Sequence, residues 1–232
     1  MKNHLTKRSE LLSALLLALL TMTAAADLYA EEAPDNAEIA PLDPLMMKLA
    51  PGEWREYRFT GGATKGSVVR WTWLETEDCN GETCQWFETL MNQNDQRLVS
   101  RILGSLDDPT AVPLSVIIQT GDMPPREMPA EMRQMSAPAL KRNLLNPPVR
   151  LQEPATIEVA AGKFTTDVYE STIGGDKALT YYSPNLPGMI VYEASAGGME
   201  LTAFGSDGTT SIEGEIINYT PLPPGVTPKR KP

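Results

Sequence analysis

The sequence predicts a mainly β protein: a single antiparallel sheet that curves strongly into an unclosed barrel of about eleven strands, with a helical segment as its lid. Short runs with apolar residues at every second position, or apolar throughout, recur from residue 53 to residue 219. Glycine-rich turn signals such as Gly197-Gly198 separate these runs. No linker-like stretch interrupts residues 51–220, so we expect this half-barrel to be one domain.

The first 26 residues, 1–26, have the three regions of an export signal peptide. Three cations precede the apolar run 11–22, and cleavage after Ala26 satisfies the rule for small residues at the cleavage site. The apolar run has 12 residues, whereas a membrane span needs roughly 20. We therefore expect a secreted or periplasmic protein that is soluble after signal removal and has no stable membrane insertion.

Two further segments differ from the sheet in composition. Residues 27–50 begin as an acidic leader rich in Ala and Pro, which buries too little apolar surface to fold alone. Asp43 followed by Pro44 is typical of a helix N-cap and first helical position, so a short helix is expected there. Residues 221–232 form a Pro-rich basic tail that we expect to be solvated.

Between these segments the alternation of apolar and polar residues predicts the strands in order. They cover residues 53–59, 67–74, 85–92, 97–103, 114–119, 156–160, 164–172, 178–182, 189–194, 199–204 and 211–219.

Cys79 and Cys84 flank the sequence Asn80-Gly81-Glu82-Thr83, and Asn-Gly is a strong signal for a tight hairpin turn. In an oxidising compartment such a pair is expected to form a disulfide that staples the hairpin. A redox-active pair usually has two intervening residues and a helix N-terminus, and this pair has neither.

The segment 123–148 interrupts the strands and is predicted to be the helical lid. Met128, Met132 and Met135 fall on one helical face, at spacings of four and three. Two interpretations of this face remain open. Methionine is a flexible apolar filler, so the face packs on the sheet or lines a ligand pocket. Alternatively, the thioethers bind Cu(I). Helical spacing alone explains the order of the methionines, which favours the first interpretation.

Trp71 and Trp73 share one face of a predicted strand. They belong either to an ordinary core or to the wall of a ligand pocket, because alternation does not determine which face of the sheet they occupy. Together with the three methionines they form the predicted pocket.

The only histidine, His4, lies in the export signal, which leaves no imidazole for a catalytic triad or a metal site. No nucleophile elbow, phosphate-binding loop or dinucleotide fingerprint occurs, so we predict no catalytic residues, no metal site and no cofactor. Carboxylates remain the only candidate acids and bases. The candidates for a hydrolase site are Glu75, Glu77 and Asp78, or Asp107 and Asp108.

The formal net charge of −10 argues against a nucleic-acid partner, because that binding draws its affinity from clustered Lys and Arg. The expected partner is a hydrophobic small molecule or a lipid, or another envelope protein.

Short strand-and-turn patterns occur at residues 51–57, 161–169, 182–188 and 199–205. Together these four patterns resemble a family of exported bacterial proteins. Its members resemble the lipoprotein-carrier (Lol-like) fold, an unclosed β-barrel whose concave face is covered by helices. The resemblance spans residues 51–220 and implies a half-barrel with 123–148 as its lid, but it implies no activity.

Together these observations predict a soluble periplasmic carrier that binds an apolar or amphiphilic ligand, a lipid or an acylated protein, between the sheet and the lid. Three alternatives stay open: a scaffold that binds another envelope protein through its sheet edge, a copper handler that uses the methionines, and a carboxylate-based hydrolase.

Overall fold

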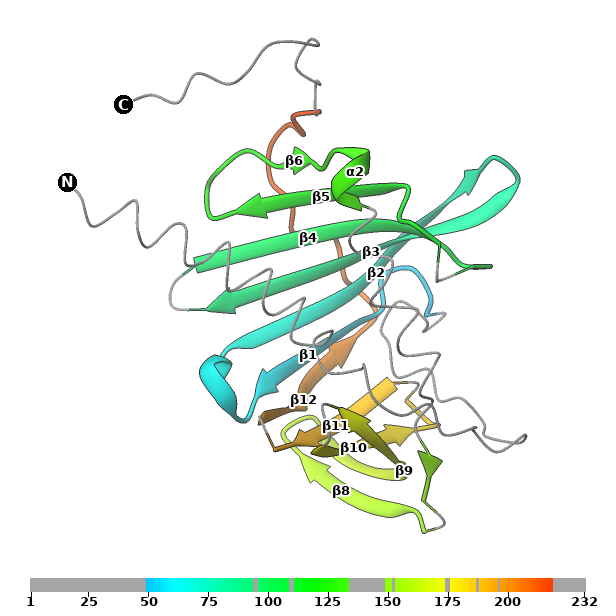
Figure 1. Cartoon of the computed structure of the whole chain (residues 1–232), viewed down its shortest axis with the longest axis vertical. Helices are drawn as coiled ribbons and strands as arrows, with labels where there is room; N and C mark the ends of the chain where they lie inside the picture. The colour runs from blue at the N-terminus through cyan, green and yellow to red at the C-terminus, as the bar shows by residue number, and fades with distance from the viewer. Residues whose placement is uncertain are drawn as a thin grey trace, which may run out of the picture.

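The strands form one antiparallel sheet in this computed structural model (Figure 1). The structure describes residues 49–93, 96–108, 111–133, 149–151, 153–173, 176–186, 188–195 and 197–218. Within them the sheet has 12 strands in the order β6-β5-β4-β3-β2-β1-β12-β11-β10-β9-β7, and β8 also pairs with β9. The expected mainly β, unclosed antiparallel sheet is therefore confirmed.

Ten strands match predicted ones, and the two additional strands, β6 and β7, have only two residues each. The strands are β1 Trp54–Phe59, β2 Val68–Cys79, β3 Glu82–Gln93, β4 Gln96–Ser105, β5 Ser115–Thr120, β6 Arg126–Glu127, β7 Val149–Arg150, β8 Ala155–Val159, β9 Gly162–Ile173, β10 Asp176–Ser183, β11 Gly188–Ala194 and β12 Gly197–Gly205. A 3-10 turn, η2, spans Gly62–Thr64.

The sheet curls at the end formed by β8 to β12, below β1 in Figure 1. There the β8–β9 hairpin folds back toward β12 of the same sheet. The ring of Phe164 in β9 lies edge-on against the ring of Phe204 in β12. We call the face enclosed by this curl, which carries Tyr57 and Leu201, the inner face and the opposite one the outer face. The main core lies on the inner face. It consists of Leu49, Tyr57, Val69, Trp71, Trp73, Phe87, Met189, Ile190, Met199 and Leu201.

The predicted strand 211–219 is wrong, because its described residues do not join the sheet as a strand. Residues 206–218 cross the outer face instead, from β12 to β6 (Figure 1). We call them the C-terminal segment. Its backbone bonds to side chains of the sheet: the Ser211 N–H donates to the buried Glu88 of β3 over 2.7 Å, and the Glu213 N–H donates to Gln119 of β5 over 2.9 Å.

The helical lid is not supported by the described part of 123–148. Only one helix occurs in it, α2 at Ala130–Arg133, with four residues. The stretch before α2 extends the sheet, because the N–H of Met128 donates to the carbonyl of Val116 over 2.7 Å. Prolines at 124, 125 and 129 supply no N–H for a helix interior.

The predicted signal peptide 1–26, most of the leader and short helix 27–50, residues 134–148 of the lid, and the tail 221–232 lie outside the described residues. Among the helices that the structure describes, none is long and apolar enough to cross a bilayer.

Candidate ligand-binding face

The strand register aligns side chains of six neighbouring strands into a row on the inner face. Neighbouring strands lie about 4.8 Å apart, so a row across six strands is about 24 Å long. Three members of this row, Arg55, Thr89 and Ser100, are polar, so we call it the polar row. From β12 to β5 it contains Phe204, Arg55, Trp71, Thr89, Ser100 and Ile118.

An apolar row lies on each side of the polar row. The register therefore places three polar side chains between two apolar rows, an arrangement that suits a molecule with both kinds of surface. The first apolar row contains Leu201, Tyr57, Val69, Met91, Leu98 and, at its end, Thr120. The second contains Trp73, Phe87, Ile102 and Val116.

Burial changes along these rows. Over β12, β1 and β2 the members of the two apolar rows are core residues, and Tyr57 and Leu201 are fully buried, whereas Phe204 of the polar row is 42% exposed. Over β3 to β5 most are only half-buried, so the inner face keeps accessible apolar surface there. The half-buried side chains are Met91, Leu98, Ile102 and Ile118.

Arg55 is the charged residue of the polar row and is only 1% exposed. It faces Trp71 and Phe204 on the two neighbouring strands, and its guanidinium lies 5.8 Å from the centre of the Phe204 ring. Nη1 donates to the carbonyl of Trp54 over 2.9 Å, and Nη2 lies 3.5 Å from a carboxylate oxygen of Glu53. Nε is buried without a hydrogen-bond partner in the described structure.

Tyr57 follows Arg55 on the same face. Its hydroxyl donates to the carbonyl of Met189 over 3.0 Å. Burial raises the pKa of this hydroxyl well above its ordinary value, and the positive charge of Arg55 offsets only part of that rise. Tyr57 is therefore a neutral donor that links β1 to β11.

The two predicted tryptophans lie on the inner face, in the core cluster. Trp71 packs against Tyr57 in a tilted arrangement with ring centres 4.6 Å apart, and Trp73 lies edge-on against Phe87. Trp73 also lines a cavity of about 30 Å³. That volume holds about one or two waters, so this cavity is too small for a lipid.

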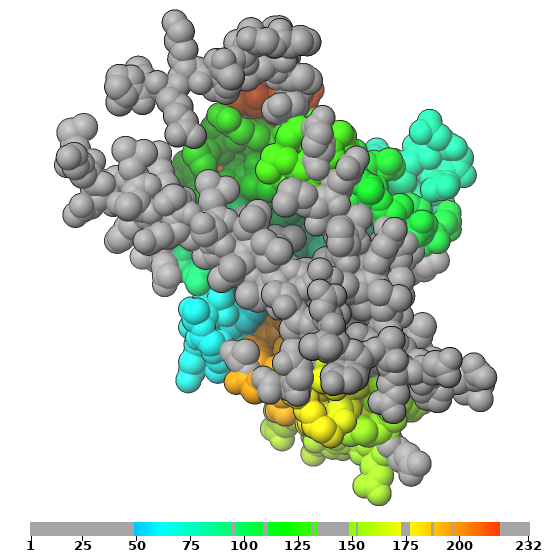
Figure 2. Space-filling view, viewed as in Figure 1, coloured from blue at the N-terminus to red at the C-terminus, as the bar shows by residue number. Residues whose placement is uncertain are grey.

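The described methionines lie away from these tryptophans, because β5, β4 and β3 separate β6 from β2, the strand that carries Trp71 and Trp73. Met128 follows β6, and Met132, which is 44% exposed, lies in α2. Figure 2 shows this green end of the molecule opposite the yellow and orange strands β10 to β12. Arg133, the next residue of α2, is half-buried. Met135 lies outside the described residues.

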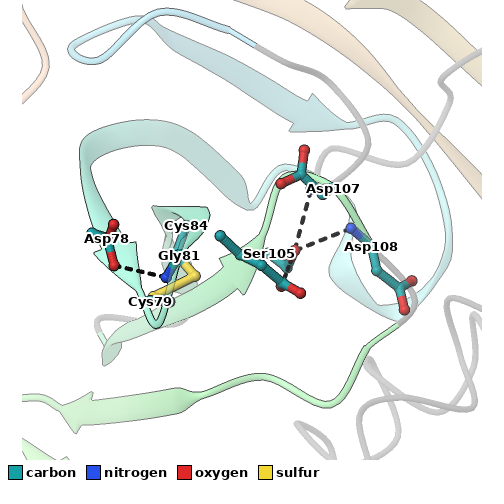
Figure 3. Close-up of a disulfide and its surroundings, with 8 residues drawn as sticks. Asp78, Cys79, Gly81, Cys84, Ser105, Asp107 and Asp108 are labelled. Atoms are coloured by element: carbon teal, nitrogen blue, oxygen red, sulfur yellow. Dashed lines mark hydrogen bonds between the residues drawn. A yellow bond between two sulfur atoms is a disulfide. The ribbon is translucent and has the colours of Figure 1, made fainter.

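The Cys79–Cys84 disulfide is confirmed (Figure 3). Asn80 adopts a positive φ of 62°, as the predicted tight turn requires, and the N–H of Gly81 donates to Asp78 over 3.0 Å. The pair closes the β2–β3 hairpin, and Cys84 is fully buried.

Two of the carboxylates considered for catalysis, Glu75 and Asp78, make structural contacts. Glu75 pairs with Arg101, and Asp78 accepts the turn N–H of Gly81. The backbone N–H groups of Asp107 and Asp108 donate to the hydroxyl of Ser105, which shapes the turn after β4 (Figure 3). Within the described residues, no group of three or more His, Cys, Asp or Glu side chains could hold a metal ion.

Sequence reasoning missed Arg55. A signal was present, because alternation from Trp54 to Phe59 places Arg55 on the same face as Tyr57 and Phe59. A cation on the apolar face of a strand is unusual, since burying a charge is costly.

No known protein family and no curated protein matches this chain. Three solved structures show a distant likeness. An exported protein with a YmcC-like fold from Bacteroides fragilis is 12% identical, with a TM-score of 0.35, over 73% of this chain and 100% of that one. A lipoprotein from Parabacteroides distasonis is 10% identical, with a TM-score of 0.32, over 69% and 98%.

PNGF-II is 9% identical, with a TM-score of 0.36, over 73% of this chain and 31% of that one. At these TM-scores the likenesses assign neither a family nor a function to the chain. The resemblance to lipoprotein carriers stays an expectation.

Proposed function

We propose that this protein is a soluble, exported, periplasmic binding protein that carries an amphiphile on its inner face. The observation that supports this is the set of parallel rows over β1 to β5. A row with three polar members runs between two apolar rows, and over β3 to β5 most of the apolar side chains are half-buried, although Phe87 and Val116 stay buried. A lipid presents the same combination of surfaces.

The hydrophobic effect supplies the affinity. An acyl chain that covers Met91, Leu98 and Ile118 removes apolar surface from water on both partners, at about 25 cal/mol per Å². The rows run across the strands, so the chain lies perpendicular to the strands. Thr89 and Ser100 offer hydroxyls along its path.

A second candidate is the scaffold that binds another envelope protein through a sheet edge. It is favoured by β7, which ends the strand order of the described sheet and carries the exposed Val149, with the exposed Leu151 beside it. An extended segment of a partner could add to such an edge.

The test is a titration of the full mature chain with laurate and lysophospholipid, followed by tryptophan fluorescence. We expect saturable one-to-one binding. Ile118→Glu should weaken it about tenfold or more, because an acyl chain cannot pair with a carboxylate brought onto its path.

The matched control is Ile217→Glu, the same substitution at a side chain of the C-terminal segment that is 47% exposed. It should leave the dissociation constant unchanged, and both variants should keep a cooperative thermal transition. If the unmodified chain binds no amphiphile, the carrier proposal is wrong, and a protein partner captured through the β7 edge becomes the leading candidate.

A further inference from the structure

We infer that the amphiphile is an acid whose carboxylate binds the Nε–Nη2 edge of Arg55. This rests on the proposed function and deepens it, because it names the chemical class of the polar end and the residue that recognises it.

The first argument is the bonding of Arg55. A guanidinium has five N–H donors, and a buried one is costly unless acceptors surround it. In the described structure, Nη1 of Arg55 donates one hydrogen bond, to the Trp54 carbonyl at 2.9 Å. The only acceptor for Nη2 is the Glu53 carboxylate at 3.5 Å, and Nε has no acceptor. The least satisfied part is thus the edge formed by Nε and Nη2.

The second argument is a comparison within the same sheet. Arg70 of β2, on the outer face, uses this same edge to bind Glu56: its Nε and Nη2 lie 3.2 and 2.8 Å from one carboxylate oxygen. A carboxylate is therefore the group that fits such an edge in this protein, and Arg55 lacks one at that distance. Arginine and carboxylate have matching planar geometry.

The third argument is a second buried donor on the same face. Trp73 is 1% exposed, and its Nε1 has no hydrogen-bond partner in the described structure. It lies two residues beyond Trp71, the cross-strand partner of Arg55, and its backbone N–H bonds to the Glu53 carbonyl. A carboxylate accepts more than two hydrogen bonds, so it can serve donors beyond the guanidinium.

The negative charge of Glu53 beside Arg55 favours a ligand whose polar end carries one negative charge rather than two. The second oxygen of Glu53 already accepts the N–H of Ala50 over 2.7 Å, which holds this carboxylate beside the guanidinium. A doubly charged phosphate would meet its repulsion more strongly than a singly charged carboxylate would. The apolar tail then follows the rows toward Ile118, and the exposed Phe204 ring lies over the guanidinium.

The experiment compares three ligands with one tail: laurate, dodecanol and dodecyl phosphate. They are titrated into delipidated full mature chain at pH 8, with calorimetry as the readout. We expect laurate to bind about tenfold more tightly than dodecanol, and more tightly than dodecyl phosphate. Arg55→Gln should reduce the ratio of laurate to dodecanol to below about threefold, whereas Arg70→Gln, the outer-face control, should keep it.

The outcomes separate the two proposals. Binding of none of the three ligands overturns the amphiphile carrier itself. Equal binding of laurate and dodecanol leaves the carrier standing and overturns the role of Arg55, as does an Arg55→Gln variant that keeps the preference. Tighter binding of dodecyl phosphate overturns the choice of carboxylate. The comparison of ligands on the unmodified chain needs no variant, and Arg55→Lys, which keeps the charge without the planar edge, replaces Arg55→Gln if that variant does not fold.

Discussion

Trp54 and Asp207 connect β1 to the C-terminal segment on the outer face. The indole Nε1 of Trp54 donates to a carboxylate oxygen of Asp207 over 2.8 Å, and the Arg70 guanidinium lies 4.3 Å from the Trp54 ring centre. The Trp54 hydrogen bond is the main cause that lowers the pKa of Asp207, and the charge of Arg70 adds to it. Because the folded-state pKa lies below the unfolded one, the stabilisation is present above the ordinary Asp pKa and is lost as pH falls through the folded value.

Trp54→Phe should raise the pKa of Asp207 toward its ordinary value, because phenylalanine has no N–H to donate. An NMR titration of the carboxyl carbon measures it. Trp86→Phe is the control: Trp86 also stacks under an arginine, Arg101, but has no contact to Asp207 in the described structure, so the pKa should stay low. An unchanged pKa in Trp54→Phe would show that the hydrogen bond is not its cause.

At the scale of elements, polar side chains hold the C-terminal segment over β3 and β5, and one isolated bridge pairs its Ile217 with Arg126 of β6. Glu88, fully buried in β3, accepts from the hydroxyl of Thr210 over 2.6 Å and from the N–H of Ser211 over 2.7 Å. Gln119 accepts the N–H of Glu213 and donates to its carbonyl. These contacts replace the bonds that a strand partner would make.

Glu88→Ala should lower the free energy of unfolding by about 1–3 kcal/mol, because it removes two hydrogen bonds that join a buried carboxylate to the C-terminal segment. Urea unfolding measures the change, and limited proteolysis should show earlier cleavage within 206–218. Glu158→Ala, an exposed carboxylate of β8, should change stability by less than about 0.5 kcal/mol. Equal stability of the two variants would contradict an anchoring role for Glu88.

The β2–β3 hairpin is stapled by the Cys79–Cys84 disulfide, which joins residues separated by five positions. So short a loop limits the entropic gain to about 2 kcal/mol, below the roughly 3 kcal/mol of a 15-residue loop. Urea unfolding of the unmodified chain and of the Cys79→Ser, Cys84→Ser double variant should differ by about this amount. Detection of two free thiols in non-reduced exported protein would refute the pairing.

At the scale of the whole molecule, the curl of the sheet separates a packed end from an accessible one. The turn after β1 meets the β11–β12 turn so closely that a Cβ on Gly61 would lie 2.8 Å from the Cα of Gly197. The same curl encloses Met199 and Leu201, whereas Met91, Leu98 and Ile118 lie on strands further from it. The proposed ligand face exists because the curl does not extend to β5.

Local alternation of side chains predicted most of the sheet, because each strand's pattern is contained within its own few residues. The C-terminal segment was mistaken for a strand for the same reason. Its alternation is real, but its partners Glu88 and Gln119 lie 122 and 94 residues away. The helical lid was predicted because methionine spacing suits a helix. The described part of 123–148 does not support it, since the N–H of Met128 donates to the carbonyl of Val116 on the neighbouring strand.

The sequence by itself determined the β class, ten of the strands and the disulfide, since all of these depend on neighbours in the chain. Only the tertiary structure decided which face of each strand is enclosed. Alternation places Arg55 with Tyr57, and Trp71 with Trp73, but it assigns neither pair to the core. That assignment required the β8–β9 hairpin, about a hundred residues later in the chain, to pack against β12. A sheet face is buried only when another element covers it, and here that element, the β8–β9 hairpin, is distant in sequence from β1 and β2.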